Sequence, residues 1–218
     1  MNAVFGLNIQ PDHGHFVDTE MVGGNFDCVE LVDPTPDGGY TPQGLLSGRH
    51  IKTGGLPTRM KWLDPNGHPV PDFDRQFCIN VSERAKAVIE GIEPGVHQFA
   101  PIEYVDRHGR HIEDRYLLIV GNRIDSLDHE RTTLVLVAGR MWMPAADLAD
   151  RPDLIPPGFN VGTQPKLVFS LDKIGTASMW CDKHLSTAGP FISVSLADAL
   201  QRSGCTGLRL DDAKAEAV

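Results

Sequence analysis

Glycine and proline divide the first seventy residues into short pieces, and this feature limits the possible folds more than any other. Breakers recur at residues 33–39, 54–55 and 64–67, where Asp-Pro, Gly-Gly and Asn-Gly pairs favour turns. Only short strand-like runs lie between or beside them, at residues 4–7, 26–32 and 60–63. We therefore expect residues 1–70 to be rich in loops.

A strand followed by a helix is predicted beyond these breakers. Residues 77–81 have the sequence Phe-Cys-Ile-Asn-Val, which is typical of a strand, and Ser82 is a favourable N-cap. The apolar residues of the next stretch have helical spacing, at Ala85, Val88, Ile89 and Ile92. They predict a helix from Glu83 to about Gly91 with one buried face.

Further strand-like runs follow this helix. Residues 96–105 and 115–124 are joined by the turn sequence Asp-Arg-His-Gly at 106–109, which predicts an antiparallel hairpin. Residues 132–138 are continuously apolar and β-branched, which predicts a central strand covered on both faces. Two more strands are expected at 166–171 and 178–181.

A second helix is predicted near the end of the sequence. Ser195, with Asp198 three residues on, resembles a capping box for a helix over 196–202 that ends at Gly204. The same Ile-x-Val-Ser pattern precedes both helices, at 79–82 and 192–195. It fits either two equivalent units or independent capping of two helices. A strand at 206–210 follows.

Together these patterns predict an α+β fold with a mixed, mainly antiparallel sheet and a few short helices. We expect one domain over residues 1–212, with a loop-rich part at 1–70 and a core at 71–212, and a polar tail at 213–218 that frays. With 41% hydrophobic and 22% charged residues, the chain can bury a core without disulfides or metals. The cysteines lack zinc or disulfide spacing, so we expect reduced, packed thiols at Cys28, Cys78, Cys181 and Cys205.

The charge balance bears on the kind of partner. Twenty Lys and Arg residues oppose 29 Asp and Glu residues, and the net charge of −9 disfavours nucleic acid and anionic membranes. A basic protein partner would be attracted instead. The sequence has no secretory signal and no apolar run near the ~20 residues of a membrane helix, so we expect a cytoplasmic protein. No pattern indicates a homo-oligomer, and self-association stays open.

Motifs for metal, cofactor or nucleophilic chemistry are not found in the sequence. The closest histidine pairs are His13 with His15 and His108 with His111, and neither has the spacing of a helical zinc motif. No Gly-x-Ser-x-Gly sequence and no phosphate-binding glycine loop occurs. We therefore expect no catalytic residue, no metal and no cofactor.

Several residues are candidates for contact with a partner. Asp125, Asp128 and Glu130 follow a predicted strand, and they fit either a pair of acid and base carboxylates or, as we favour, turn residues that bind backbone amides. In both cases they form an acidic edge. Trp142 and Trp180 lie beside methionines and are expected in the core, whereas Trp62 is expected to be the most accessible tryptophan.

The order of short motifs between Met60 and Leu210 resembles a family of predicted bacterial immunity proteins. The motifs lie at residues 81–84, 97–103, 115–120, 125–128 and 205–210. The family is the eleventh of the immunity families of polymorphic-toxin systems and was formerly a domain of unknown function. Ala100, where a second aromatic residue is usual, and Gly121 depart from its pattern, and the first sixty residues lie outside it.

This resemblance implies a non-catalytic, cytoplasmic protein that binds and neutralises a cognate toxin. The toxin-interface candidates are then Asp125, Asp128, Glu130, Trp62, His108 and His111. Two alternatives stay open: a small hydrolase that uses Asp125, Asp128 and a histidine such as His97 or His129, and an adaptor protein of a secretion system.

Overall fold

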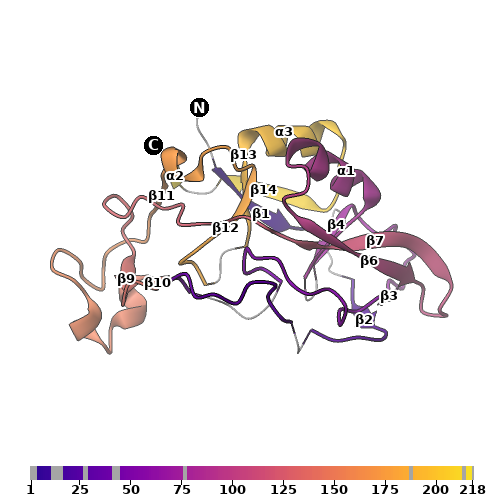
Figure 1. Ribbon diagram of the computed structural model, residues 1–218, viewed down its shortest axis with the longest axis horizontal. Helices are drawn as coiled ribbons and strands as arrows, with labels where there is room; N and C mark the ends of the chain where they lie inside the picture. The colour runs from indigo at the N-terminus through magenta and orange to yellow at the C-terminus, as the bar shows by residue number, and fades with distance from the viewer. Residues whose placement is uncertain are drawn as a thin grey trace.

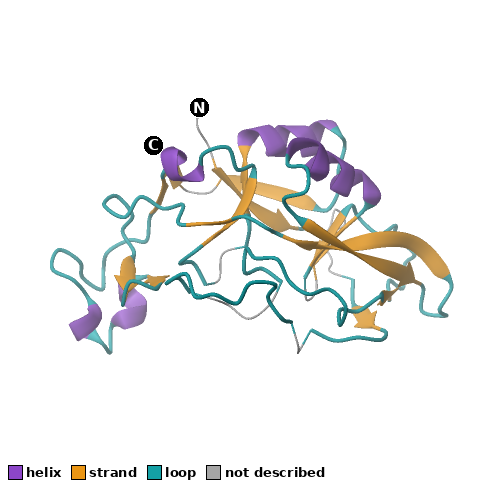
Figure 2. Ribbon diagram, in the orientation of Figure 1, coloured by secondary structure: helices purple, strands orange, loops and turns teal. Residues whose placement is uncertain are grey.

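The computed structural model of the protein describes residues 4–10, 17–26, 29–40, 45–75, 78–186, 189–212 and 215–217. They form two large sheets, two small sheets and three short α-helices. Figures 1 and 2 show how these elements are arranged. Most strand pairs are antiparallel, and β3 with β6, β8 with β12 and β11 with β15 are parallel. The predicted α+β class with a mixed, mainly antiparallel sheet is confirmed.

The larger sheet has six strands in the order β2-β3-β6-β7-β5-β4. Its strands are β2 (Thr19–Met21), β3 (Arg59–Trp62), β4 (Phe73–Arg75), β5 (Ile79–Val81), β6 (Gln98–Val105) and β7 (His111–Ile119). The predicted hairpin is formed by β6 and β7, which pair along their whole length. Between β2 and β3 the described residues contain no strand, and the expected run at 26–32 contributes only an isolated bridge between Leu31 and Ile51.

The second sheet has five strands in the order β14-β1-β13-β12-β8. They are β14 (Leu208–Asp212), β1 (Val4–Ile9), β13 (Phe191–Ser193), β12 (Met179–Asp182) and β8 (Arg123–Ile124). The predicted run 115–124 is therefore divided between the two sheets. The chain passes from β7 to β8 at Gly121, where a Cβ atom would collide with the backbone carbonyl of Val96.

The remaining strands form two small sheets. β9 (Val135–Val137) pairs with β10 (Met141–Met143), and β11 (Leu167–Phe169) pairs with β15 (Ala215–Ala217). Part of the tail that was expected to fray is thus paired with β11. Two short 3-10 helices, Ala145–Leu148 and Pro152–Leu154, follow β10, and this region lies at one end of the long axis (Figure 1).

The main core lies between the two large sheets and the helices α1 (Glu83–Ile92) and α3 (Val194–Arg202), which lie side by side (Figure 2). Each helix turns one apolar face inward, as its spacing requires. The buried residues on these faces are Ala85, Ile89, Leu196, Ala197 and Leu200. The third helix, α2 (Leu171–Ile174), is a single turn.

The opposite face of the six-stranded sheet is covered by the loop-rich N-terminal part. Leu45, Ile51 and Leu56 from the loops pack in one cluster with Leu117 and Ile119 of β7. Leu118 and Val120, which alternate with them, belong to the core on the helix side. β7 is therefore the strand that is covered on both faces.

The prediction that residues 132–138 form a central strand is wrong. β9 pairs only with β10, and Leu136 and Val137 are only half-buried. The chain reverses immediately after β9, because Ala138 and Gly139 adopt positive φ angles of 50° and 68°. A strand that turns back so soon forms a short hairpin at the periphery.

The two long helices begin at serine N-caps. Ser82 caps α1 as predicted, and its hydroxyl accepts a hydrogen bond from Ala85 N. For α3 the prediction of Ser195 is wrong, because Ser193 accepts from Leu196 N and the helix already begins at Val194. The N-cap is thus the fourth residue of the first Ile-x-Val-Ser segment and the second residue of the other segment. This difference favours independent capping of the two helices.

The cysteines of the described residues are free thiols. Cys78 and Cys181 are buried and Cys205 is partly buried, whereas Cys28 lies outside the described residues. Burial raises the pKa of the Cys181 thiol to about 12. Cys78 and Cys181 are thus packed as small apolar side chains, as expected.

Candidate functional site

The acidic edge predicted at residues 125–130 begins directly after β8. Because β8 pairs with β12, this segment lies beside residues 182–185. Asp182 is buried, and its carboxylate accepts hydrogen bonds from the backbone and hydroxyl of Ser126 at 2.8 and 2.7 Å. It also accepts from the backbone N–H groups of His184 and Leu185. Asp182 thus fixes both segments around Asp125.

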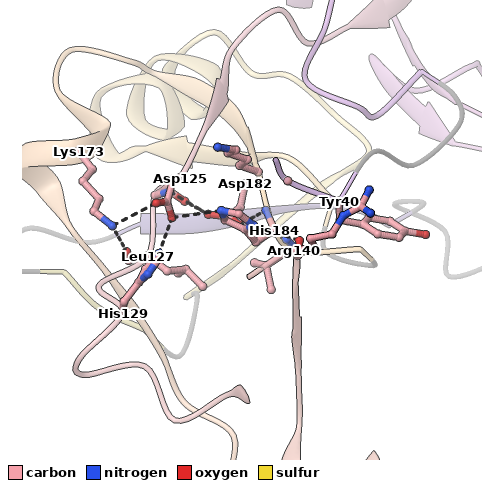
Figure 3. A network of polar contacts seen from close by, with 12 residues as sticks. Tyr40, Asp125, Leu127, His129, Arg140, Lys173, Asp182 and His184 are labelled. Carbon is pink, nitrogen blue, oxygen red and sulfur yellow. Dashed lines mark hydrogen bonds and ion pairs between the residues drawn. The ribbon is translucent and has the colours of Figure 1, made fainter. Parts of the chain in front are cut away.

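Asp125 is the centre of a cluster of three basic side chains (Figure 3). Its Oδ1 lies 2.8 Å from His129 Nε2 and 3.9 Å from His184 Nε2. Its Oδ2 lies 3.4 Å from Lys173 Nζ, which also donates to the carbonyl oxygen of Leu127 at 2.8 Å. Burial by itself would raise the pKa of Asp125, but the hydrogen bond from His129 and the nearby positive charges lower it below its ordinary value. Asp125 is therefore a carboxylate at neutral pH.

His184 connects this cluster to the β9–β10 hairpin. It is 5% exposed, and its Nδ1 lies 3.0 Å from the carbonyl oxygen of Arg140. A ring nitrogen that faces a carbonyl oxygen must carry a proton, so Nε2 is the nitrogen left to face Asp125. The backbone of Trp142 donates to the carbonyl of His184, and its ring meets His129 edge-on at 5.0 Å. The cluster therefore holds the hairpin against the five-stranded sheet.

Asp128 and Glu130 do not join Asp125. The carboxylate of Asp128 accepts from the backbone N–H groups of Glu130 and Arg131 at 2.9 and 3.1 Å, and these hydrogen bonds lower its pKa. This is the turn role that we favoured from the sequence. Glu130 is exposed.

The geometry limits what the cluster can do chemically. Asp125 and His129 form a pair in which the carboxylate orients the imidazole, as in many general bases. Within the described part of the chain, however, no hydroxyl or thiol group is hydrogen bonded to His129 or His184. His97 lies elsewhere, with its side chain fully buried against Glu93. The described residues also contain no group of three or more His, Cys, Asp and Glu side chains that could hold a metal ion.

The other candidates lie on the β6–β7 hairpin and beside it. His108 and His111 are exposed near its tip, and His111 Nε2 is 3.2 Å from Asp114. Trp62 is the most exposed of the three tryptophans, as expected, but at 8% exposure it is still a buried residue, and its ring packs beside that of Tyr104 with ring centroids 6.4 Å apart. Trp62 and His108 nevertheless line the same groove. The structure thus separates the candidates into two groups, and the hairpin tip lies at the opposite end of the long axis from β9 and β10 (Figure 1).

Sequence reasoning missed Lys173, His184 and Asp182. Each lies about fifty residues or more along the chain from the residue that it contacts at the Asp125 cluster. Asp182 and His184 are placed there by the pairing of β8 with β12, and Lys173 is placed there by α2. No local motif records such a contact.

A family model matches residues 37–215, which is most of the chain, and its description is Immunity protein family (Imm11). The protein belongs to this family. The Imm11 match includes the Asp125 cluster and the β6–β7 hairpin. It also extends further toward the N-terminus than the motifs in the sequence, so the loops at Leu45, Ile51 and Leu56 belong to the Imm11 region.

β1 and β2 precede the residues matched by Imm11, although β1 lies inside the five-stranded sheet. Among curated proteins, none matches the chain. No helix in the described part of the chain is long and apolar enough to cross a membrane.

Proposed function

We propose that this protein binds a cognate bacterial toxin in the cytoplasm of the cell that makes both and thereby neutralises it. The observation that carries the proposal is the match to the immunity protein family over residues 37–215. The carboxylate of Asp125 is engaged by basic groups of the same chain, which favours a structural role for the cluster over the alternative of a hydrolase site. The carboxylate of Asp128 is likewise engaged by its own turn.

The net charge supports a basic toxin as the partner. A formal charge of −9 gives a field that accelerates the approach of a positively charged protein, and salt weakens this effect. Glu130 is an exposed carboxylate beside the Asp125 cluster that is open to such a partner. We propose this edge and the β6–β7 hairpin tip, with His108 and His111, as contact regions.

Co-expression tests the proposal directly. The toxin domain encoded beside this gene is induced in a bacterial host with and without this protein, and surviving colonies are counted. We expect growth arrest without the protein and full survival with it. A variant of the toxin with its catalytic residue substituted should form a stable complex with the protein in size-exclusion chromatography. Continued growth arrest together with the absence of a complex would refute the proposal.

A further inference from the structure

A groove of about 390 Å³ lies between the turn after β3 and the tip of the β6–β7 hairpin. Its apolar lining includes Trp62, the half-buried Val70 and Ile112, which is 40% exposed. Among the described residues, only Val32, Ile112 and Val161 are exposed large hydrophobic side chains. Ile112 thus offers apolar surface that no neighbouring side chain covers.

Both walls of the groove are held in place by an aspartate. Asp64 accepts hydrogen bonds from the backbone N–H groups of Asn66 and His68. Asp106 accepts from the backbone N–H groups of His108 and Arg110 at 2.8 and 2.9 Å. The indole N–H of Trp62 donates to the carbonyl oxygen of His68 at 3.3 Å, which ties the first wall to β3. A groove with walls fixed in this way requires little ordering when it is filled.

The charges in the groove leave one cation unpaired. The negative charge of Asp106 is offset by Arg110, whose guanidinium lies 2.7 Å from it, and Asp64 lies 2.9 Å from His68. Arg107 is exposed, and within the described ranges no carboxylate lies within ion-pair distance of it. Its Nε donates to His108 Nε2 at 3.1 Å, which holds the guanidinium at the rim. The groove therefore combines an apolar floor with a free positive charge.

We infer that this groove receives a segment of the toxin in which an apolar side chain stands next to a carboxylate. The apolar side chain packs against Trp62, Val70 and Ile112, and the carboxylate pairs with Arg107. This inference rests on the proposed function and adds the place and chemistry of one contact. A local acidic contact is compatible with a basic toxin, because the net charge acts over long range whereas Arg107 acts at the interface.

The inference is tested by two substitutions in the groove, one that removes an apolar side chain and one that reverses a positive charge. Ile112→Asp and Arg107→Glu are compared with the wild-type protein for binding to the catalytically inactive toxin domain. We expect Ile112→Asp to raise the Kd by about 30-fold or more, as a hot-spot residue does, and Arg107→Glu by at least about 10-fold. The effect of Arg107→Glu should shrink in 0.5 M NaCl, because salt screens the exposed pair (~4 Å Debye length at that concentration).

Matched controls lie outside the groove. Val161→Asp replaces another exposed apolar residue, in the loop beyond β10, and Arg202→Glu reverses an exposed charge on α3. Both controls should bind with an unchanged Kd, and circular dichroism and urea unfolding should show that all four variants are folded. Tighter binding by Arg107→Glu would show that the segment in the groove is basic and would overturn the inference.

The failure of the inference is distinguishable from the failure of the proposed function. If the wild-type protein neither binds the toxin domain nor rescues growth, the proposed function fails. If the wild-type protein binds and both groove variants bind equally well, only the groove is excluded. Hydrogen exchange gives a second measurement, since a filled groove should slow exchange at residues 64–70 and 106–112 in the complex.

Discussion

Glu93 ends α1 and at the same time connects the two large sheets. Its carboxylate accepts hydrogen bonds from the backbone of Ser178 and Met179 at 2.8 and 2.9 Å, and from Asn122 and His97 at 3.0 and 2.9 Å. The Nδ1 atom of His97 accepts from Gly121 N, so Nε2 carries the proton and donates to Glu93. His97 is therefore held by its neighbours and does not serve as a free base.

Replacement of Glu93 tests this connection. Glu93→Gln places an amide N–H₂ group opposite groups that donate, and we expect it to lower the free energy of unfolding at pH 7 by about 1–3 kcal/mol. Urea unfolding measures the change. Glu90→Gln is the matched control and should have little effect on the free energy of unfolding. Glu90 lies on the same helix, and its side chain has no hydrogen-bonded or ionic partner among the described residues.

The same variant has a defined pH dependence. Burial alone would raise the pKa of Glu93, but the hydrogen bonds from His97 and from the backbone lower it below its ordinary value. A lowered folded-state pKa gives stability that is present above the unfolded-state pKa, near ~4.3, and is lost as the pH falls through the folded-state pKa. The wild-type protein should therefore lose more stability than Glu93→Gln on acidification below about pH 5. Parallel stability curves would contradict this role of Glu93.

At the scale of single residues, the sequence predicted the roles of those residues whose partners lie close in the chain. Asp128 could be assigned to its turn because its carboxylate accepts hydrogen bonds from the backbone of Glu130 and Arg131, two and three residues further along the chain. The role of Glu93 could not be predicted, because its partner Ser178 lies 85 residues away and is brought near only by the packing of β12. The same reason hid Lys173 and His184 from sequence reasoning.

Among the elements, the beginnings of the two long helices are the clearest test of local prediction. Ser193→Ala removes the acceptor for Leu196 N and should lower the free energy of unfolding by about 1 kcal/mol. Ser195→Ala, in the exposed first turn, should change it by less than ~0.5 kcal/mol. Thermal or urea unfolding of both variants decides the position of the cap. A larger effect at Ser195 would place the cap where the sequence predicted it.

The elements that could be predicted are those set by local periodicity and turn residues. α1 and the β6–β7 hairpin have both signals, and both occur, although the second strand of the hairpin covers residues 111–119 instead of the predicted 115–124. A continuous apolar run does not by itself show what covers it. β7 is covered on both faces because α1 and the N-terminal loops pack on it, whereas β9 turns back at Gly139 and only its first residue, Val135, is buried.

For the whole molecule, β1 is the element whose position the sequence did not reveal. It lies between β13 and β14, and Val4 and Leu7 are buried at 2% and 1% exposure. A chain that starts at residue 37, where the family match starts, lacks this strand and leaves β13 and β14 without their shared partner.

We expect this truncated chain to be unfolded or aggregated, since it loses buried apolar area and many backbone hydrogen bonds together. Circular dichroism and size-exclusion chromatography measure the outcome. A chain that starts at Val4 is the control and should unfold at the wild-type temperature. A cooperative unfolding transition of the truncated chain near that temperature would show that β1 is dispensable.

The pairing of β1 with β14 also determines when the five-stranded sheet can form during synthesis. Phe5 lies opposite Asp212 and Ile9 opposite Leu208, so the sheet joins the first described strand to a strand that a ribosome makes about 200 residues later. Synthesis at about 5–20 residues per second takes roughly 10–40 s to advance from β1 to Leu208, and the sheet cannot close before Leu208 has been made. Under the proposed function, a nascent chain gives no protection until residues 208–212 have left the ribosome and β14 has paired with β1.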